Sequence, residues 1–211
     1  MNDMNAAFKK SISAMGIKAG DHIGFDEQRI NIRFEIGGQE DVYKHRLGLK
    51  RYSYTNPQYV NEAFKRAKTL YNFLPNHPDI MRIEIQKSKM RKTMKFLKKL
   101  GIGKYQQKVQ STQTIDGDVV FHLYWQVHKL PVDKLLKEII LSDIGGCNLL
   151  DSKVHFLDIE NNVIYHLYDD RGCDIIAEKK EDIYKFYDKY YDWILEYDLK
   201  DINKIFNDNN Q

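Results

Sequence analysis

Residues 154–177 read VHFLDIENNVIYHLYDDRGCDIIA, and this stretch decides the fold class. Two apolar runs, 154–159 and 163–168, are separated by Asn161-Asn162, a pair that tolerates the positive φ of a tight hairpin turn. A second turn is expected at 170–172, followed by a short strand at 173–177. Short strands joined by tight turns predict an antiparallel arrangement in this half of the chain.

The first half of the chain has a different pattern. Residues 30–36 alternate apolar and charged side chains, which is typical of a half-buried strand. A helix is predicted from Asn56-Pro57 to residue 74, and residues 80–85 then repeat the design of the first strand, with Arg82 and Glu84 facing outward. A strand, a helix and a matching strand predict a βαβ-like crossover with parallel neighbours.

Further helices are expected at 4–15, 88–100 and 131–144 and near the C-terminus, and further strands at 105–113 and 118–127. We therefore predict an α+β fold: a mixed sheet with one βαβ-like unit, C-terminal antiparallel hairpins, and helices packed on the sheet. Residues 1–211 are expected to form a single domain. Its parts are an N-terminal helix and lead-in at 1–29, a core at 30–206 and a frayed tail at 207–211.

Charge is distributed unevenly along the 211 residues. Residues 1–150 hold 25 basic and 15 acidic side chains, whereas residues 151–211 hold 8 and 15, so the two parts carry about +10 and −7. The N-terminus lacks a basic segment followed by an apolar one, no apolar run is long enough for a membrane span, and two cysteines are too few for a disulfide scaffold. These features predict a cytoplasmic protein without a membrane partner.

The run HLYDDRGCDIIA at 166–177, followed by Tyr187, Tyr190 and DWIL at 192–195, resembles a bacterial family known as domain of unknown function 3885. The match is specific from residue 166 to residue 206, within a family-like C-terminal half at 118–206. Weaker similarity occurs at 32–37, in Tyr59, Ala63, Arg66 and Ala67, and in Leu135-Leu136 with Asp143. It implies an intracellular bacterial protein of α+β type. Since that family has no assigned catalytic residues or ligand, the resemblance implies nothing about a site.

The turn at 169–174 is the densest cluster of chemically capable side chains. One hypothesis is that Asp169, Asp170 and Asp174 bind a divalent cation while Arg171 counters phosphate charge, as in a metal-dependent phosphoesterase or nuclease. The alternative is a structural turn in which the aspartates accept backbone N–H bonds, Gly172 adopts positive φ and Arg171 is held by a carboxylate. This alternative is favoured, because no further carboxylate motif completes a coordination shell.

Histidines and tyrosines form a second candidate. A two-residue loop at Asn161-Asn162 places His155 and His166 diagonally on one sheet face. His122 and Tyr124 share the semi-polar face of an earlier strand. If these strands are neighbours, they form a surface that could bind a ligand or titrate near neutral pH. The alternative is that the histidines are simply packed, since no metal-binding spacing accompanies them.

The third candidate is a basic segment at 87–108, which has no carboxylate before Asp116. Positive charge with interleaved aromatics suits nucleic acid, but the same charge can recognise an acidic protein, and a lysine-rich helix face is often only solvated. The residues proposed for binding in the segment and in the preceding loop are Lys92, Lys95, Lys98 and Lys99, with Arg51, Tyr52 and Tyr54.

From these features we predict a non-enzymatic protein that binds a macromolecule, a protein partner being favoured over nucleic acid, in a role such as immunity protein or antitoxin. No cofactor or metal is expected. A covalent role for Cys173 is disfavoured, because the carboxylates beside it raise the thiol pKa. The competing hypotheses are metal-dependent phosphoester chemistry at Asp169, Asp170, Arg171 and Asp174, and nucleic-acid binding through the segment 87–108.

Overall fold

The computed structural model describes residues 3–18, 21–45, 53–115, 117–145, 150 and 152–207. These residues form a seven-stranded sheet in the order β1-β9-β8-β7-β4-β6-β5 and a separate two-stranded hairpin of β2 and β3. The strands are β1 (Asn31–Glu35), β2 (Tyr43–His45), β3 (Ser53–Thr55), β4 (Ile80–Gln86), β5 (Gln107–Ile115), β6 (Asp118–Gln126), β7 (Lys153–Asp158), β8 (Val163–Leu167) and β9 (Gly172–Ala177). The α-helices are α1 (Met4–Ala14), α2 (Pro57–Asn72), α3 (Lys87–Lys99), α4 (Val132–Ile144), α5 (Lys180–Lys189) and α6 (Leu199–Asn207).

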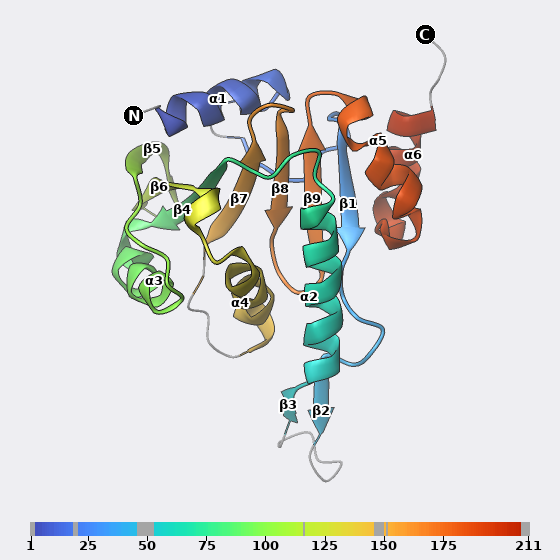
Figure 1. The fold of residues 1–211 in the computed structure, drawn as a ribbon, viewed down its shortest axis with the longest axis horizontal. Helices are drawn as coiled ribbons and strands as arrows, with labels where there is room; N and C mark the ends of the chain where they lie inside the picture. The colour runs from blue at the N-terminus through green and yellow to red at the C-terminus, as the bar shows by residue number, and fades with distance from the viewer. Residues whose placement is uncertain are drawn as a thin grey trace.

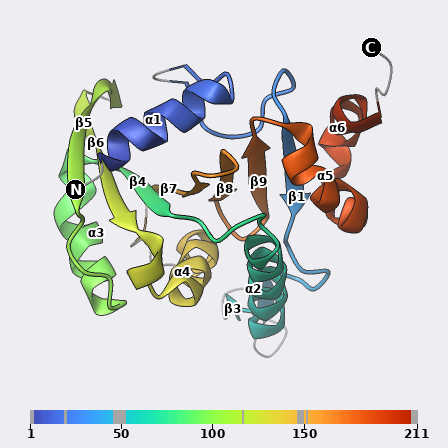
Figure 2. The same cartoon turned by 45° about the horizontal axis from the view of Figure 1, so that its top comes forward.

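The elements form three layers, with the sheet in the middle and helices on both of its faces (Figure 1). The predicted α+β class is therefore confirmed. Helices α2, α3 and α4 cover one face, and α1 with the segment that follows it covers the other (Figure 2). Helices α5 and α6 lie beyond β1 at the edge of the sheet. None of the helices in the described residues is long and apolar enough to cross a membrane.

The sequence explains the best-defined elements. Asn56 caps α2, because its side chain accepts a hydrogen bond from the Gln58 N–H, and Pro57 occupies the first turn. Every residue of β8 and β9 is buried, since these central strands are covered on both faces. Tyr165 on β8 shows how the layers are joined: its hydroxyl donates to the Ala67 carbonyl of α2 at 2.9 Å.

The predicted parallel pairing of β1 with β4 is wrong. All strand pairs among the described residues are antiparallel, and β9, β8 and β7 lie between β1 and β4. β1 and β4 therefore point in the same direction without touching. The physical reason is that β7, β8 and β9 pair with one another through short connections, and β4 then has β6 on its other side.

The loop between β7 and β8 also differs from expectation. Asp158 pairs with Val163, so the loop has four residues rather than two. The Asp158 carboxylate fixes it by accepting hydrogen bonds from the Glu160 and Asn161 N–H groups at 3.1 and 3.2 Å. Asn162 has φ 49°, as expected for this turn. The two-residue shift in register leaves the same side chains on each face, but it changes which residues lie opposite one another.

Candidate functional site

One register position carries a polar residue on six consecutive strands, and we call this set the polar row. Arg33 pairs with Asp174, Asp174 with His166, and Arg82 with both His155 and Tyr124. His155 and His166 close the remaining gap, with their rings stacked at 4.5 Å between centroids. The row lies on the face covered by α1 and comprises, from β1 to β6, Arg33, Asp174, His166, His155, Arg82 and Tyr124.

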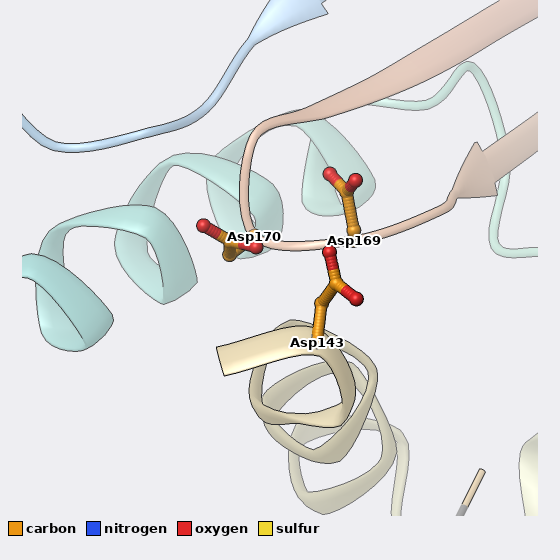
Figure 3. A group of neighbouring side chains, drawn as sticks. All are labelled: Asp143, Asp169 and Asp170. Atoms are coloured by element: carbon orange, nitrogen blue, oxygen red, sulfur yellow. The ribbon is translucent and has the colours of Figure 1, made fainter. Parts of the chain in front are cut away.

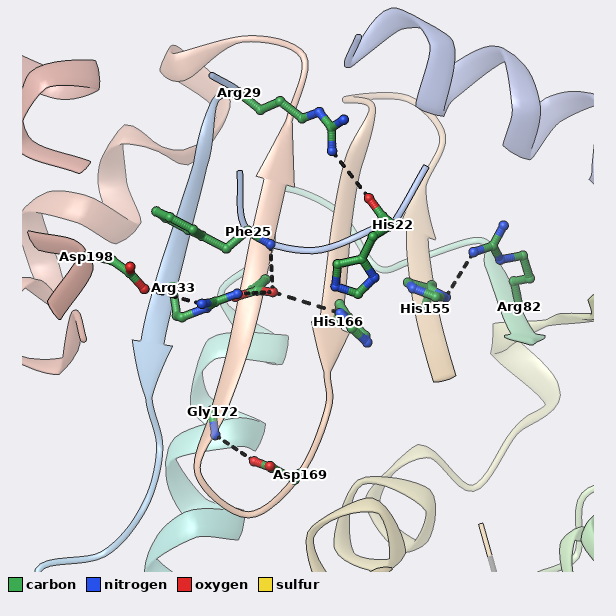
Figure 4. Close-up of polar contacts among 11 residues, drawn as sticks. His22, Phe25, Arg29, Arg33, Arg82, His155, His166, Asp169, Gly172 and Asp198 are labelled. Atoms are coloured by element: carbon green, nitrogen blue, oxygen red, sulfur yellow. Dashed lines mark hydrogen bonds and ion pairs between the residues drawn. The ribbon is translucent and has the colours of Figure 1, made fainter. Parts of the chain in front are cut away.

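At the β1 end of the row, Arg33 and Asp174 form an ion pair, and each also has a further hydrogen-bond partner (Figure 4). Arg33 Nε donates to Asp174 Oδ1 at 2.8 Å, and Arg33 Nη1 donates to Asp198 Oδ2 at 3.4 Å. Asp174, only 1% exposed, also accepts the Phe25 N–H at 3.0 Å. Burial opposes ionisation of Arg33, but the carboxylate of Asp174 outweighs it and raises the guanidinium pKa.

The two histidines in the middle of the row are buried and neutral. Burial first, then the positive charges of His22 and Lys153, lower the pKa of His166 to about 3. Burial and Arg82 lower the pKa of His155 well below 6.5. His166 Nδ1 lies 4.0 Å from Asp174 Oδ2, which is too long for a hydrogen bond. Neither ring nitrogen of His166 has a hydrogen-bond partner among the described residues.

Arg82 was expected to face outward, and this expectation is wrong: the residue is 4% exposed. The reason is that α1 packs over it, with the Phe8 ring 4.4 Å from the guanidinium carbon. Arg82 Nη2 lies 3.3 Å from His155 Nδ1 and 3.7 Å from Glu84 Oε2. A guanidinium only donates hydrogen bonds, so His155 Nδ1 must accept and its proton lies on Nε2. Burial lowers the pKa of Arg82, opposed by Tyr124 and Glu84.

Polar contacts also attach α1 to the β6 end of the row. The Tyr124 hydroxyl donates to Asn5 Oδ1 at 2.9 Å, and the Asn5 N–H donates to Gln107 Oε1 at 2.8 Å. Apolar side chains of α1 and of the following segment fill the rest of this face. The row is therefore enclosed between the sheet and a cover that the chain supplies before β1.

Two pockets open beside the row. The larger has a volume of about 340 Å³ and is lined by His22, Arg33, Ser152, Lys153, His166, Tyr168 and Asp174. The smaller, about 150 Å³, lies at the other end, and its polar lining includes Arg82, Glu84, His122 and Tyr124. Of the histidine and tyrosine positions proposed from the sequence, His166 lines the larger pocket, and His122 and Tyr124 line the smaller one. His155 lines neither pocket and is stacked on His166. The shared histidine and tyrosine surface was conditional on β6 and β7 being neighbours, and this condition is not met, because β4 separates them.

The aspartates of the turn at 169–174 do not converge on one point. Asp169 accepts hydrogen bonds from the Arg171 and Gly172 N–H groups at 2.8 and 3.3 Å and from Arg171 Nε at 2.9 Å. Asp170 accepts the Tyr59 hydroxyl at 2.6 Å, whereas Asp174 lies on the opposite sheet face in the polar row. This geometry does not assemble the proposed four-residue cation site.

A different carboxylate group forms beside the turn. Asp143, at the end of α4, approaches Asp169 and Asp170, so that their oxygens lie within 4.8 Å of one another (Figure 3). Much of the hydrogen-bonding capacity of this group is already used by Arg171, Tyr59 and the turn N–H groups. Burial, reinforced by Asp169, raises the pKa of Asp170, which makes it a poorer cation ligand.

The glycine in this turn has a role other than the one expected. Gly172 does not have positive φ; it is needed for space. A Cβ atom there would overlap the Tyr168 hydroxyl and lie 2.9 Å from the Phe34 carbonyl oxygen. Cys173, the next residue, is fully buried on the face of α2, and burial followed by the charge of Asp174 raises its thiol pKa well above the usual range.

The basic candidates lie elsewhere on the molecule. Lys92, Lys95, Lys98 and Lys99 are exposed on α3. Tyr54 is exposed on β3, in the hairpin near one end of α2 and apart from α3 (Figure 1). Arg51, Tyr52, Cys147 and the tail 208–211 lie outside the described residues.

Sequence reasoning missed Arg33, Arg82, His22 and Lys153 as members of a site. The strand patterns marked Arg33 and Arg82 as charged and therefore as outward-facing. One available signal was the run VIYHL at 163–167, whose five successive apolar or aromatic positions indicate a strand covered on both faces. A second covered face requires a second layer, which α1 provides.

A family model described as "Domain of unknown function (DUF3885)" matches residues 18–198, which include the whole polar row but not α1. Uncharacterized protein YnaE of Bacillus subtilis (strain 168) is 36% identical over 83 residues, a match that covers 36% of this chain and 39% of that protein. The match therefore spans less than half of the relative's length. No solved structure matches the chain.

Proposed function

We propose that this chain, which belongs to the family described as domain of unknown function 3885, acts by binding an acidic protein partner through one end of its sheet. The observation that carries the proposal is the concentration of positive charge there. Residues 87–115 contain nine basic and no acidic side chains. Eight of the nine are exposed and define the basic face: Lys87, Arg91, Lys92, Lys95, Lys98, Lys99, Lys104 and Lys108.

The geometry of α3 supports a preformed surface. Thr93 and Leu97 are buried against the sheet, so the orientation of the helix is fixed by packing. On its outer side Arg91, Lys95 and Lys99 follow one another at i,i+4 spacing. Like charges at this spacing each destabilise a helix by roughly 0.2–0.5 kcal/mol. An acidic partner would relieve this repulsion, which gives the surface an electrostatic reason to bind one.

A protein partner is favoured over nucleic acid because exposed aromatic side chains are not found beside the lysines of α3 in the described residues. Tyr105 is half-buried and packs edge-on against Trp125 at 6.1 Å between ring centroids. Tyr54 is exposed but lies in the separate β2–β3 hairpin. Single-stranded nucleic acid is held largely by stacking on exposed rings. The rings next to Lys104 and Lys108 are the half-buried Tyr105 and the buried Phe121, which weakens that alternative.

The most specific form of the proposal is an immunity-like role inside a bacterial cell, in which the basic face covers an acidic surface of a toxin. The test is to mix the purified chain with proteins encoded beside its gene and to measure complex formation by calorimetry at low and moderate salt. The variant Lys92→Glu/Lys95→Glu/Lys98→Glu/Lys99→Glu should weaken the complex by at least about tenfold, because attraction becomes repulsion.

A matched control has the same change in net charge at four exposed lysines outside the basic face: Lys65, Lys137, Lys185 and Lys200, each changed to glutamate. This control should retain the complex. Equal loss in both variants would mean that only net charge matters. A failure to form any stable complex with a neighbouring protein counts against the proposal, and tight, salt-sensitive binding to DNA or RNA would favour the nucleic-acid alternative.

A further inference from the structure

Among the described residues, His166 is the one with two buried side-chain polar atoms that lack a hydrogen-bond partner, whereas Asn31, Arg82 and His155 each have one. His166 is 3% exposed, and both of its ring nitrogens are without a hydrogen-bond partner among the described residues. A buried polar group left in this state has lost its hydrogen bonds to water without replacing them, which destabilises the folded chain. Asp174, its neighbour in the row, is by contrast held by Arg33 and by the Phe25 N–H. Within this pair, the unused hydrogen-bonding capacity therefore lies on the histidine.

His166 also lines the 340 Å³ pocket, together with His22, whose ring centroid lies 6.3 Å from its own. A neutral imidazole offers one donor and one acceptor. Pockets of roughly 300–1,000 Å³ suit small molecules, and this one lies at the lower end of that range. The lining thus combines an unpartnered buried imidazole with space for a compact ligand.

The charges around this pocket identify the class of ligand. Asp174 is neutralised by Arg33, which uses three of its five N–H donors in bonds to Asp174 and Asp198 and so retains two. Lys153 pairs with Glu84 at 3.5 Å, but the lysine side chain is 47% exposed, so this pair is weak. Lys153 can therefore offer positive charge, and Arg33 can offer two N–H donors, to an incoming oxyanion.

A metal ion fits this pocket poorly. The one group of carboxylate, histidine or cysteine ligands that is close enough for an ion within the described part of the chain is Asp143, Asp169 and Asp170. The weakly paired Lys153 ammonium would also repel a metal ion.

We propose that the pocket lined by His22, Arg33, Lys153, His166 and Tyr168 binds a small organic anion. Its carboxylate or phosphate group pairs with Lys153 and the spare N–H groups of Arg33, and its polar body hydrogen-bonds to His166. The Tyr168 and His22 rings border the ligand. This site is separate from the basic face, so it stands or falls independently of the proposed protein partner.

The test uses the full chain with ¹⁵N-labelled histidine imidazoles and a fixed set of probes at millimolar concentration. The probes are inorganic phosphate, citrate, 4-hydroxybenzoate, adenosine monophosphate and Zn²⁺. At least one organic anion should shift the His22 and His166 signals saturably, and comparison of the carboxylates with adenosine monophosphate distinguishes the two anion types. The four-lysine basic-face variant should bind that anion unchanged.

Two variants test whether the shifts of the histidine signals report binding in this pocket. Lys153→Gln should weaken the anion about threefold to tenfold, as expected for loss of a charge-assisted hydrogen bond at a partly exposed site. Lys65→Gln, a matched exposed change on α2, should leave affinity unaltered. His166→Phe should abolish binding; if it fails to fold, Lys153→Gln decides. The proposal is overturned if no organic anion shifts both histidine signals, if only Zn²⁺ does, or if Lys153→Gln binds as well as the parent chain.

Discussion

At the scale of single residues, the polar row contains two different solutions to burying charge. Asp174 is held in an ion pair with direct hydrogen bonds, which is the arrangement that makes a buried carboxylate tolerable. Arg82 has no ion pair of that quality: its neighbours are a neutral histidine at 3.3 Å, a carboxylate at 3.7 Å, the Tyr124 hydroxyl and the Phe8 ring. The buried charge of Asp174 at the β1 end of the row is therefore compensated by a direct ion pair, whereas the buried charge of Arg82 is not.

This difference predicts that Asp174→Asn destabilises the protein. Asparagine keeps the shape but removes the charge that compensates Arg33, and it weakens the bond to the Phe25 N–H. Because the Arg33 side chain is 26% exposed, we expect a loss of about 2–4 kcal/mol in the free energy of unfolding rather than the full loss for a dry pair. Urea denaturation measures it. Asp192→Asn, at an exposed position, is the control; equal small effects from both changes would refute this view of the ion pair.

At the scale of elements, local patterns predicted most of the helices and strands. The cap at Asn56 and the regular apolar spacing predicted α2, and the turn residues predicted the β7-β8-β9 succession. Pairing between distant strands could not be predicted in this way. The alternation in β1 and β4 indicates that each strand has one apolar and one polar face, but it does not indicate which strand lies beside it. The predicted adjacency of β1 and β4 was therefore wrong.

The candidate site was less predictable than the fold, for a related reason. His155 and His166 were identified from the sequence, but their direct stacking depends on the four-residue loop that Asp158 fixes. Arg82 became a buried residue only because α1 docks over it, and a charged position in an alternating strand normally indicates exposure. Contacts between remote segments, rather than local propensity, create the polar row.

The β8–β9 turn provides a prediction at this scale. Gly172→Ala should destabilise the chain by about 1–3 kcal/mol, because the added methyl group collides with the Tyr168 hydroxyl and with the backbone oxygen of Phe34. Gly103→Ala is the matched control, since its Cβ meets nothing within 4 Å. Thermal unfolding of the two variants gives the comparison. A neutral effect at Gly172 would mean that β1 and the turn are not packed as closely as described.

At the scale of the whole molecule, the buried histidines predict acid sensitivity. His166 faces His22, Lys153, Arg82 and Glu84, and its pKa of about 3 lies below 6.5 because of burial first and the nearby positive charges second. Between about pH 6.5 and 5 the unfolded chain binds protons at His155 and His166 that the folded chain does not. The free energy of unfolding should therefore fall as the pH is lowered through this window.

The size of this effect follows from the number of protons involved. Unfolding should take up as many as about two protons from the histidine pair in that window. The pKa of Glu84, lowered to about 2, causes a further loss of stability only at lower pH, below about 4.5. Chemical denaturation at several pH values measures the slope. In His166→Phe the slope should decrease by about one proton; an unchanged slope would contradict the assignment.

Burial of His155, His166 and Arg82 in the middle of the row requires the strand order, the register and the docking of α1 together. The direct measurement is a pH titration of the ¹⁵N imidazole signals of the folded protein, with the urea-unfolded chain as reference. The account predicts that His155 and His166 stay neutral at pH 5, where the unfolded chain is protonated, and that the proton of His155 resides on Nε2. Titration of both folded histidines near pH 6.5 would contradict it.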